Sequence, residues 1–203
     1  MALRSSTTSA QARSTRRWNA DAVDVWDTTA RRRRAHIVIP DYNMWAMQLS
    51  PDGRLLATGS SNGHLEVWNA RTGHLVHKLP YGPGGSSISG ARFSPDSNTL
   101  AAGGDGRTVR FWSMNDGRQV GPTLTGFAGT VADAAYTLDG KRLVVCAAEQ
   151  VTIWDPTTGD MVAELLAIAD DTNFYSVAVS PDGGRFAVTG KWGLAYVLPM
   201  PGP

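Results

Sequence analysis

Residues that build cross-links and metal clusters are scarce in this sequence. The 203 residues include one cysteine, Cys146, and four histidines. One sulfur excludes an internal disulfide and a cysteine-based zinc cluster, because both need several sulfurs at close spacing. We interpret Cys146 as a small buried hydrophobic residue. His64, His74 and His77 are close in sequence and numerous enough for a metal site, but no carboxylate supports one. We interpret them as surface histidines on strands and predict no metal site.

Long apolar runs are also missing. No stretch approaches the roughly 18 uninterrupted apolar residues that a membrane-spanning helix needs, and the N-terminus lacks the apolar run of a secretory signal. We therefore expect no membrane association and a cytoplasmic location. The composition, 42% hydrophobic and 18% charged, is ordinary for a globular protein with a sizeable core.

Motifs of the common catalytic sites are missing too. The sequence has no Gly-Xaa-Ser-Xaa-Gly elbow and no His-Glu-Xaa-Xaa-His pair. Its glycine-rich segment 81–87 lacks the Lys-Ser/Thr ending that holds phosphate. We therefore predict that the protein is not an enzyme and uses no cofactor.

Acidic residues are absent from the first 20 positions, which carry four arginines and many serines and threonines. This composition buries too little apolar surface to fold alone, so we predict a disordered, basic, Ser/Thr-rich tail over residues 1–21. Arginines 31–34 form a run that, with Arg16 and Arg17, could neutralise phosphates. No aromatic stacking array accompanies the run. We interpret it as a solvated turn between strands and do not expect nucleic acid as a partner.

What the sequence does contain is a repeat of about 43 residues. A turn motif close to Ser-Pro-Asp-Gly begins at residues 50, 94, 137 and 180, at spacings of 44, 43 and 43. Its aspartates are Asp52, Asp96, Asp139 and Asp182. A second motif runs in step at spacings of 42, 44, 42 and 43, and its last residues are Trp26, Trp68, Trp112, Trp154 and Val197. Two motifs with one period indicate a repeat architecture.

Each repeat contains four short strand patterns. The first strand starts six residues before each turn motif, at Met44, Ile88, Val131 and Phe174. Asp and Gly tolerate the positive φ angles of tight turns, so a second strand follows at once. A loop leads to the third strand, which ends at the tryptophan, and a further turn opens the fourth. The repeats cover residues 22–43 in part, 44–87, 88–130, 131–173, and 174–198 in part.

These features resemble the WD40 family. The period, the Ser-Pro-Asp-Gly turn and the pairs Trp26-Asp27 and Trp154-Asp155 carry the resemblance. It implies an all-β fold, a β-propeller of four-stranded blades, in which the turn aspartates and the tryptophans maintain the structure of each repeat. The Gly-His that the family places before the first strand is absent throughout. We therefore expect an incomplete Asp-His-Ser-Trp hydrogen-bond network and blades held mainly by apolar packing.

The strand count within residues 22–203 gives three complete blades and two partial ones. The chain enters this domain in a third strand, adds a fourth at about 35–39, and leaves it after a third strand at 194–198. We predict that strand 35–39 pairs with the three C-terminal strands and closes a ring of about four blades. Two alternatives stay open: a homodimer that completes an eight-blade ring, and a truncated piece of a longer protein with blades missing. We prefer the hypothesis of a truncated piece of a longer protein.

The predicted binding face gathers the loops from fourth to first strand and from second to third strand, which by resemblance is the family's usual partner-binding face. These loops are rich in aromatic residues flanked by a few charges, which is typical of interface hot spots. The predicted protein-binding residues are Tyr42, Trp45, Tyr81, Phe127, Asp170, Asp171, Phe174, Tyr175 and Trp192. Trp45 and Tyr175 share one repeat position, where the other repeats carry the small residues Ser89 and Ala132.

The resulting functional hypothesis is a non-catalytic scaffold for a protein or peptide partner, as a regulatory or sensor part of a signalling protein. Two alternatives from other classes stay open. One is a propeller hydrolase with a metal or acid site at the ring axis. The other is a non-functional fragment of a longer WD40 protein.

Overall fold

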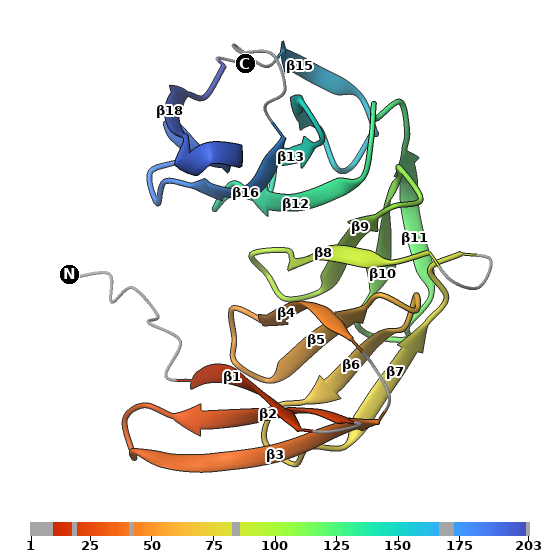
Figure 1. The fold of residues 1–203 in the computed structure, drawn as a ribbon, viewed down its shortest axis with the longest axis vertical. Coiled ribbons are helices and arrows are strands. Elements are labelled where there is room, and N and C mark those ends of the chain that lie inside the picture. Colours follow the sequence, from red (N-terminus) through yellow and green to blue (C-terminus); the bar gives the residue numbers. More distant parts are fainter. Residues whose placement is uncertain (1–9, 18–19, 41–42, 83–85, 167–172, 202–203) are drawn as a thin grey trace.

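The computed structural model describes residues 10–17, 20–40, 43–82, 86–166 and 173–201. In these ranges the chain forms eighteen strands in five antiparallel sheets, and its one helical segment is the single 3-10 turn η1 (Lys191–Gly193). The predicted all-β fold is confirmed. Figure 1 shows the sheets following one another around an arc, with one strand of each complete blade on the inner side.

Three of the sheets are complete four-stranded blades, as predicted. The first complete blade consists of β4 (Met44–Leu49), β5 (Leu55–Ser60), β6 (Leu65–Asn69) and β7 (Leu75–Leu79). The second consists of β8 (Ile88–Phe93), β9 (Thr99–Gly104), β10 (Val109–Ser113) and β11 (Gln119–Leu124). The third consists of β12 (Val131–Tyr136), β13 (Leu143–Ala147), β14 (Gln150–Trp154) and β15 (Met161–Leu166). The innermost strands β4, β8 and β12 pack side by side, followed by β16 of the last sheet.

The two end sheets have three strands each, and they do not close the ring as predicted. The N-terminal sheet contains β1 (Ala10–Arg17), β2 (Ala20–Asp27) and β3 (Arg32–Pro40), and the C-terminal sheet contains β16 (Phe174–Val179), β17 (Arg185–Gly190) and β18 (Ala195–Pro199). The predicted closing strand, β3, pairs with β2 through a tight hairpin, while β18 pairs with β17. The hairpin satisfies β3 locally, at a lower entropic cost than pairing with the distant C-terminal sheet.

The predicted disordered tail is wrong for the part of residues 1–21 that the structure describes. Ala10–Arg17 forms β1, which pairs along its whole length with β2 in an unbroken antiparallel register. Composition indicated disorder because this segment buries little by itself. The exposed edge of β2 supplies backbone hydrogen-bond partners that composition does not reveal.

The last repeat also departs from the predicted alignment by one residue. In the second complete blade, Trp112 pairs with Leu100, which lies six residues after the start of its turn motif. Phe186 lies at the same distance after the start of the last turn motif, and it pairs with Leu198. Val197 is therefore not the counterpart of the tryptophans. Phe186 and Leu198 are 12 residues apart, as are Leu56 and Trp68 in the first complete blade. Leu143 and Trp154 are only 11 residues apart, so the shorter third blade caused the shift.

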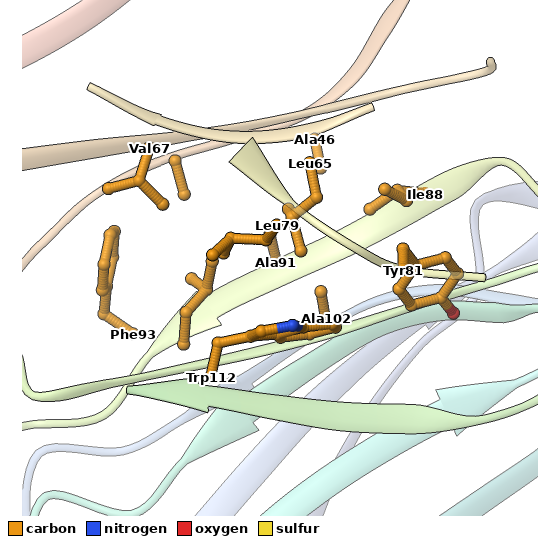
Figure 2. Close-up of a cluster of buried hydrophobic side chains, with 12 residues drawn as sticks. Ala46, Leu65, Val67, Leu79, Tyr81, Ile88, Ala91, Phe93, Ala102 and Trp112 are labelled. Carbon is orange, nitrogen blue, oxygen red and sulfur yellow. The ribbon is translucent and has the colours of Figure 1, made fainter. Parts of the chain in front are cut away.

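The core lies between neighbouring sheets. Figure 2 shows one such layer, where Trp112 and Phe93 of the second complete blade face Val67 and Leu65 of the first. Small residues on the second strand of a blade let the next innermost strand approach. A Cβ on Gly103 would lie 2.5 Å from Val131 Cγ1, too close for any real contact.

The expected incomplete polar network is visible at the tryptophans. Trp68 Nε1 donates a hydrogen bond to Thr58 Oγ1 at 3.0 Å. Trp112 is fully buried, and its Nε1 finds no acceptor within the described residues. Thr58 lies eight residues after the start of its turn motif, and the equivalent residue in the blade of Trp112 is Ala102. The missing hydroxyl explains the unpaired indole nitrogen.

Candidate protein-binding groove

Each innermost strand carries a β-bulge at the same repeat position. The pairing of β4 with β5 skips one residue between Met44 and Ala46, and the skipped residue is Trp45. The equivalent irregularities in β8, β12 and β16 fall at Ser89, Ala132 and Tyr175. Bulges bend a strand and redirect a side chain away from the regular pleat. The position noticed in the sequence is therefore a geometric feature of the repeat.

The four bulged residues line one groove, which we call the bulge groove. Its volume is about 650 Å³. The described residues that line it are Trp45, Ser89, Thr130, Ala132, Ala148, Asn173, Phe174 and Tyr175. Trp45 is 58% exposed and Tyr175 is 57% exposed, although both are large aromatic residues. The small Ser89 and Ala132 lie at the corresponding positions of the two strands between them.

Two of the predicted binding residues, Tyr81 and Phe127, are buried in the core instead. Tyr81 packs against Trp112 and donates a hydrogen bond to the Thr108 carbonyl at 3.1 Å. Phe127 lies 5.4 Å from the Trp154 ring, measured between ring centroids. These side chains belong to loops on the predicted face, but they fill the space between blades, where burial of apolar area stabilises most.

Phe174 is also buried, and it contributes both to the core and to the wall of the bulge groove. Its ring packs against Tyr196 at 6.4 Å and contributes to the last inter-sheet core, while one part of it lines the bulge groove. We therefore assign it as groove wall and not as an exposed anchor. Tyr42, Asp170 and Asp171, also predicted to bind, lie outside the described residues.

Trp192, at 79%, is the most exposed of those predicted residues that the structure describes. It adopts a positive φ of 66° inside η1, and the Lys191 ammonium lies 5.2 Å from the centre of its ring. The Lys191 amide donates a hydrogen bond to the Asn173 carbonyl at 2.8 Å, which ties this turn to the groove wall. Trp192 itself does not line the groove. It is an exposed aromatic residue in a turn anchored to the wall.

A buried ion pair lies beside the bulges, and sequence reasoning missed it. The Asp133 carboxylate pairs with the Arg92 guanidinium at 2.7 Å and accepts hydrogen bonds from the Ser176 hydroxyl at 2.9 Å and the Val177 amide at 3.2 Å. These partners come from β8 and β16, on either side of β12. The signal in the sequence was a lone carboxylate in the apolar strand Val131–Tyr136. The pair ties together three innermost strands that carry bulges.

Comparison with known proteins agrees with this architecture. The family profile "WD domain, G-beta repeat" matches residues 73–113, and the profile "Anaphase-promoting complex subunit 4 WD40 domain" matches residues 14–89. The chain is a WD40-repeat protein.

Curated relatives of this WD40 chain are much longer proteins. Apoptotic protease-activating factor 1 is 25% identical over 191 residues in Homo sapiens and 22% identical over 190 residues in Rattus norvegicus. Each match covers 89% of this chain and 15% of the relative. WD repeat-containing protein 26 homolog of Drosophila melanogaster is 31% identical over 106 residues, which is 50% of this chain and 17% of that protein. The WD40 chain therefore spans about a sixth of the length of these relatives.

The described lining of the bulge groove consists of aromatic, small and uncharged polar residues. Its described lining contains no carboxylate, imidazole, thiol or amine, the groups from which most acid-base and nucleophilic sites are built. The thiol of Cys146 is fully buried nearby, and burial raises its pKa to about 12, which suits a core residue. Among the described residues no three His, Cys, Asp or Glu side chains gather as metal ligands.

The turn aspartates of the WD40 repeats are engaged within their own hairpins. In each repeat the Ser or Thr that opens the motif donates its hydroxyl to the carboxylate two residues on, at 2.5–2.6 Å. The residue after the turn adds a backbone amide, as Arg54 does to Asp52 at 3.0 Å. These contacts are local, and they agree with the structural role predicted for the aspartates.

The arginine run lies in the β2–β3 hairpin. Arg34 makes two hydrogen bonds to the Asp27 carboxylate at 2.7 and 3.0 Å, and Arg33 pairs with Asp24 at 3.3 Å. Two of the four cations are thus neutralised by the neighbouring strand. This geometry agrees with a turn between strands.

No helix of the described residues is long and apolar enough to cross a membrane.

Proposed function

We propose that this WD40 chain is a non-catalytic scaffold that binds a protein or peptide segment in the bulge groove. The observation that carries the proposal is the placement of Trp45 and Tyr175, two exposed aromatic residues, on equivalent bulges that line the same groove. Its WD40 relatives support a general role in protein interaction. The groove and its use by this chain are our proposal.

The energetics favour an aromatic anchor over scattered contacts. Complete burial of a Trp or Tyr side chain removes about 150–250 Å² from water, and roughly half of each ring is still exposed here. At about 25 cal/mol per Å², covering both rings stabilises a complex by about 4–6 kcal/mol before the costs of association. Small residues between the two rings leave room for a bound side chain.

The test compares capture of cellular proteins by the wild-type chain and by a Trp45→Ala, Tyr175→Ala double variant, followed by identification of what is retained. We expect the specific partner to be lost from the double variant. The matched control is Val76→Ala with Met161→Ala, which also removes two exposed apolar side chains, but from the outer strands β7 and β15. Equal capture by all three proteins would exclude the bulge groove as the binding site.

We further propose that the chain acts as a regulatory or sensor region within a longer, cytoplasmic protein. The much greater length of the relatives supports this proposal. Expression of the full gene product, followed by measurement of its mass, tests it directly. A mature protein of 21.7 kDa, the mass of this chain alone, would contradict it.

A further inference from the structure

A second groove lies at the opposite ends of the strands. The bulges occur where the innermost strands begin, whereas this groove is formed by the turns β8–β9 and β12–β13 and the turn after β14. It lies between the second and third complete blades and has a volume of about 500 Å³. We call it the turn-face groove. It is separate from the bulge groove and shares no lining residue with it.

The turn-face groove is acidic, and Lys141, a cation that acts on Asp139, lines the neighbouring groove instead. Asp96 and Asp139 line it, and its described lining contains no Lys, Arg or His. The hydroxyls of Ser94 and Thr137 lower the pKa of these two carboxyls, so both are ionised at neutral pH. In Asp139 the hydroxyl and the Lys141 amide both use Oδ1, which leaves Oδ2 available to a ligand.

The remaining walls combine apolar residues with four that carry a hydroxyl, Ser94, Thr99, Tyr136 and Thr157. Leu138 is 70% exposed, although the other three turn motifs have proline at this position. Pro95 and Pro156 add further apolar surface. The Tyr136 hydroxyl has no hydrogen-bond partner within the described part of the chain, and burial together with the charge of Asp96 raises its pKa, so it stays protonated. Carboxylates at an apolar rim match a side chain with a methylene stem and a cationic head.

The neighbouring groove provides an internal comparison. It lies between the third complete blade and the C-terminal sheet, has a volume of about 620 Å³, and is also lined by two turn aspartates, Asp139 and Asp182. Lys141 and Arg142 line it as well, so its carboxylates already have cations beside them. The two grooves share Leu138 and Asp139. Cations line only the neighbouring one, which we call the neutralised groove.

We propose that the turn-face groove binds an arginine or lysine side chain from an extended segment of a protein partner. The carboxylates of Asp96 and Asp139 receive the cationic head, and Leu138 covers the methylene stem. This binding does not depend on the bulge groove. It gives the chain a second, charge-selective contact on its other face.

The experiment measures binding of a labelled peptide, acetyl-Gly-Leu-Arg-Leu-Gly-amide, by NMR chemical-shift changes, with the same peptide carrying citrulline in place of arginine. Citrulline has nearly the same shape without the charge. We expect the arginine peptide to bind about tenfold more tightly, to weaken as salt is added, and to shift residues of the β8–β9 and β12–β13 turns. Equal binding of the two peptides, or no binding of the arginine peptide, overturns the proposal.

Three variants locate the site. Asp139→Asn should weaken the arginine peptide about tenfold, while Asp182→Asn, which removes the equivalent aspartate from the neutralised groove, should leave its affinity unchanged. Leu138→Pro keeps both carboxylates and installs the residue of the other turns, and it should weaken binding several-fold. Urea midpoints show that each variant is folded. Equal losses in Asp139→Asn and Asp182→Asn would mean that the effect is general electrostatics, which contradicts a specific site.

Discussion

Single residues decide whether the buried polar groups of each repeat are satisfied. Trp68 and Trp112 occupy the same repeat position, and only the first has an acceptor, because Thr58 is replaced by Ala102 in the second blade. Every substitution of this kind removes one link of the polar network and leaves apolar packing to hold the blade. The repeat motifs in the sequence are degenerate because residues of this network have been replaced.

Restoring that acceptor should stabilise the protein. We expect Ala102→Ser to raise the free energy of unfolding by about 1 kcal/mol, because it supplies a hydroxyl to the buried Trp112 Nε1 with little added volume. The reciprocal change, Thr58→Ala, should lower it by about 1–2 kcal/mol, since it leaves the Trp68 indole unpaired. Urea denaturation measures both. A destabilised Ala102→Ser protein would mean that the core has no room for the hydroxyl.

The burial of single side chains also changed which aromatic residues belong to the candidate binding site. The sequence gives the same prediction for Trp45 and Tyr81, because both are aromatic residues in loops of the same face. Tyr81 is 3% exposed and Trp45 is 58% exposed, because the first inserts between blades and the second occupies a bulge. No local pattern separates these outcomes, since both depend on the neighbouring blade.

At the scale of the element, the hairpin between the first and second strands is the most regular part of the repeat. The spacing of the turn motif in the sequence was sufficient to place this hairpin. The structure adds a hydroxyl-carboxylate contact that recurs in all four turns. The contact is local, so tertiary packing does not alter it.

These turns should make the protein sensitive to acid. Hydroxyl hydrogen bonds lower the pKa of Asp96, Asp139 and Asp182 in the folded state below the usual value of 3.8. A lowered folded pKa contributes stability above the unfolded pKa, and that contribution is lost as the pH falls through the folded pKa. We therefore expect urea midpoints to decrease between about pH 4 and pH 2.

A double variant checks the cause of that decrease. Ser94→Ala with Ser180→Ala removes the strongest pKa-lowering contact from two of the turns. The variant should be less stable at pH 7 and should lose less stability on acidification than the wild type. An unchanged slope would assign the acid sensitivity to other groups.

At the scale of the whole molecule, the array ends in unpaired strand edges. In the complete blades a fourth strand covers the third, but β18 has β17 on one side and no further strand among the described residues. Val197 on this strand is 66% exposed. An exposed edge with an apolar side chain is a template for pairing with another chain.

We therefore expect the isolated chain to self-associate. Size-exclusion chromatography with light scattering should give a mass above 21.7 kDa that increases with concentration. Val197→Lys should shift the protein toward monomer, because a charge on the strand disfavours edge pairing. A wild-type chain that stays monomeric at high concentration would show that its edges are protected, and it would count against the homodimer alternative.

The sequence by itself determined the repeat, its four strands and the turn that joins the first two. Period, alternation and turn chemistry act over a few residues, and they are the same wherever the blade lies. Only the tertiary structure decided which aromatic residues stay exposed, that β1 and β3 pair with β2, and that Asp133 ties three innermost strands together. Exposure of the aromatic residues and the ties of Asp133 depend on contacts between segments some 40 residues apart, such as Asp133 with Arg92 and Ser176, and no local pattern encodes them. The pairing of β1 and β3 with β2 is local, but the composition of the basic segment did not reveal it.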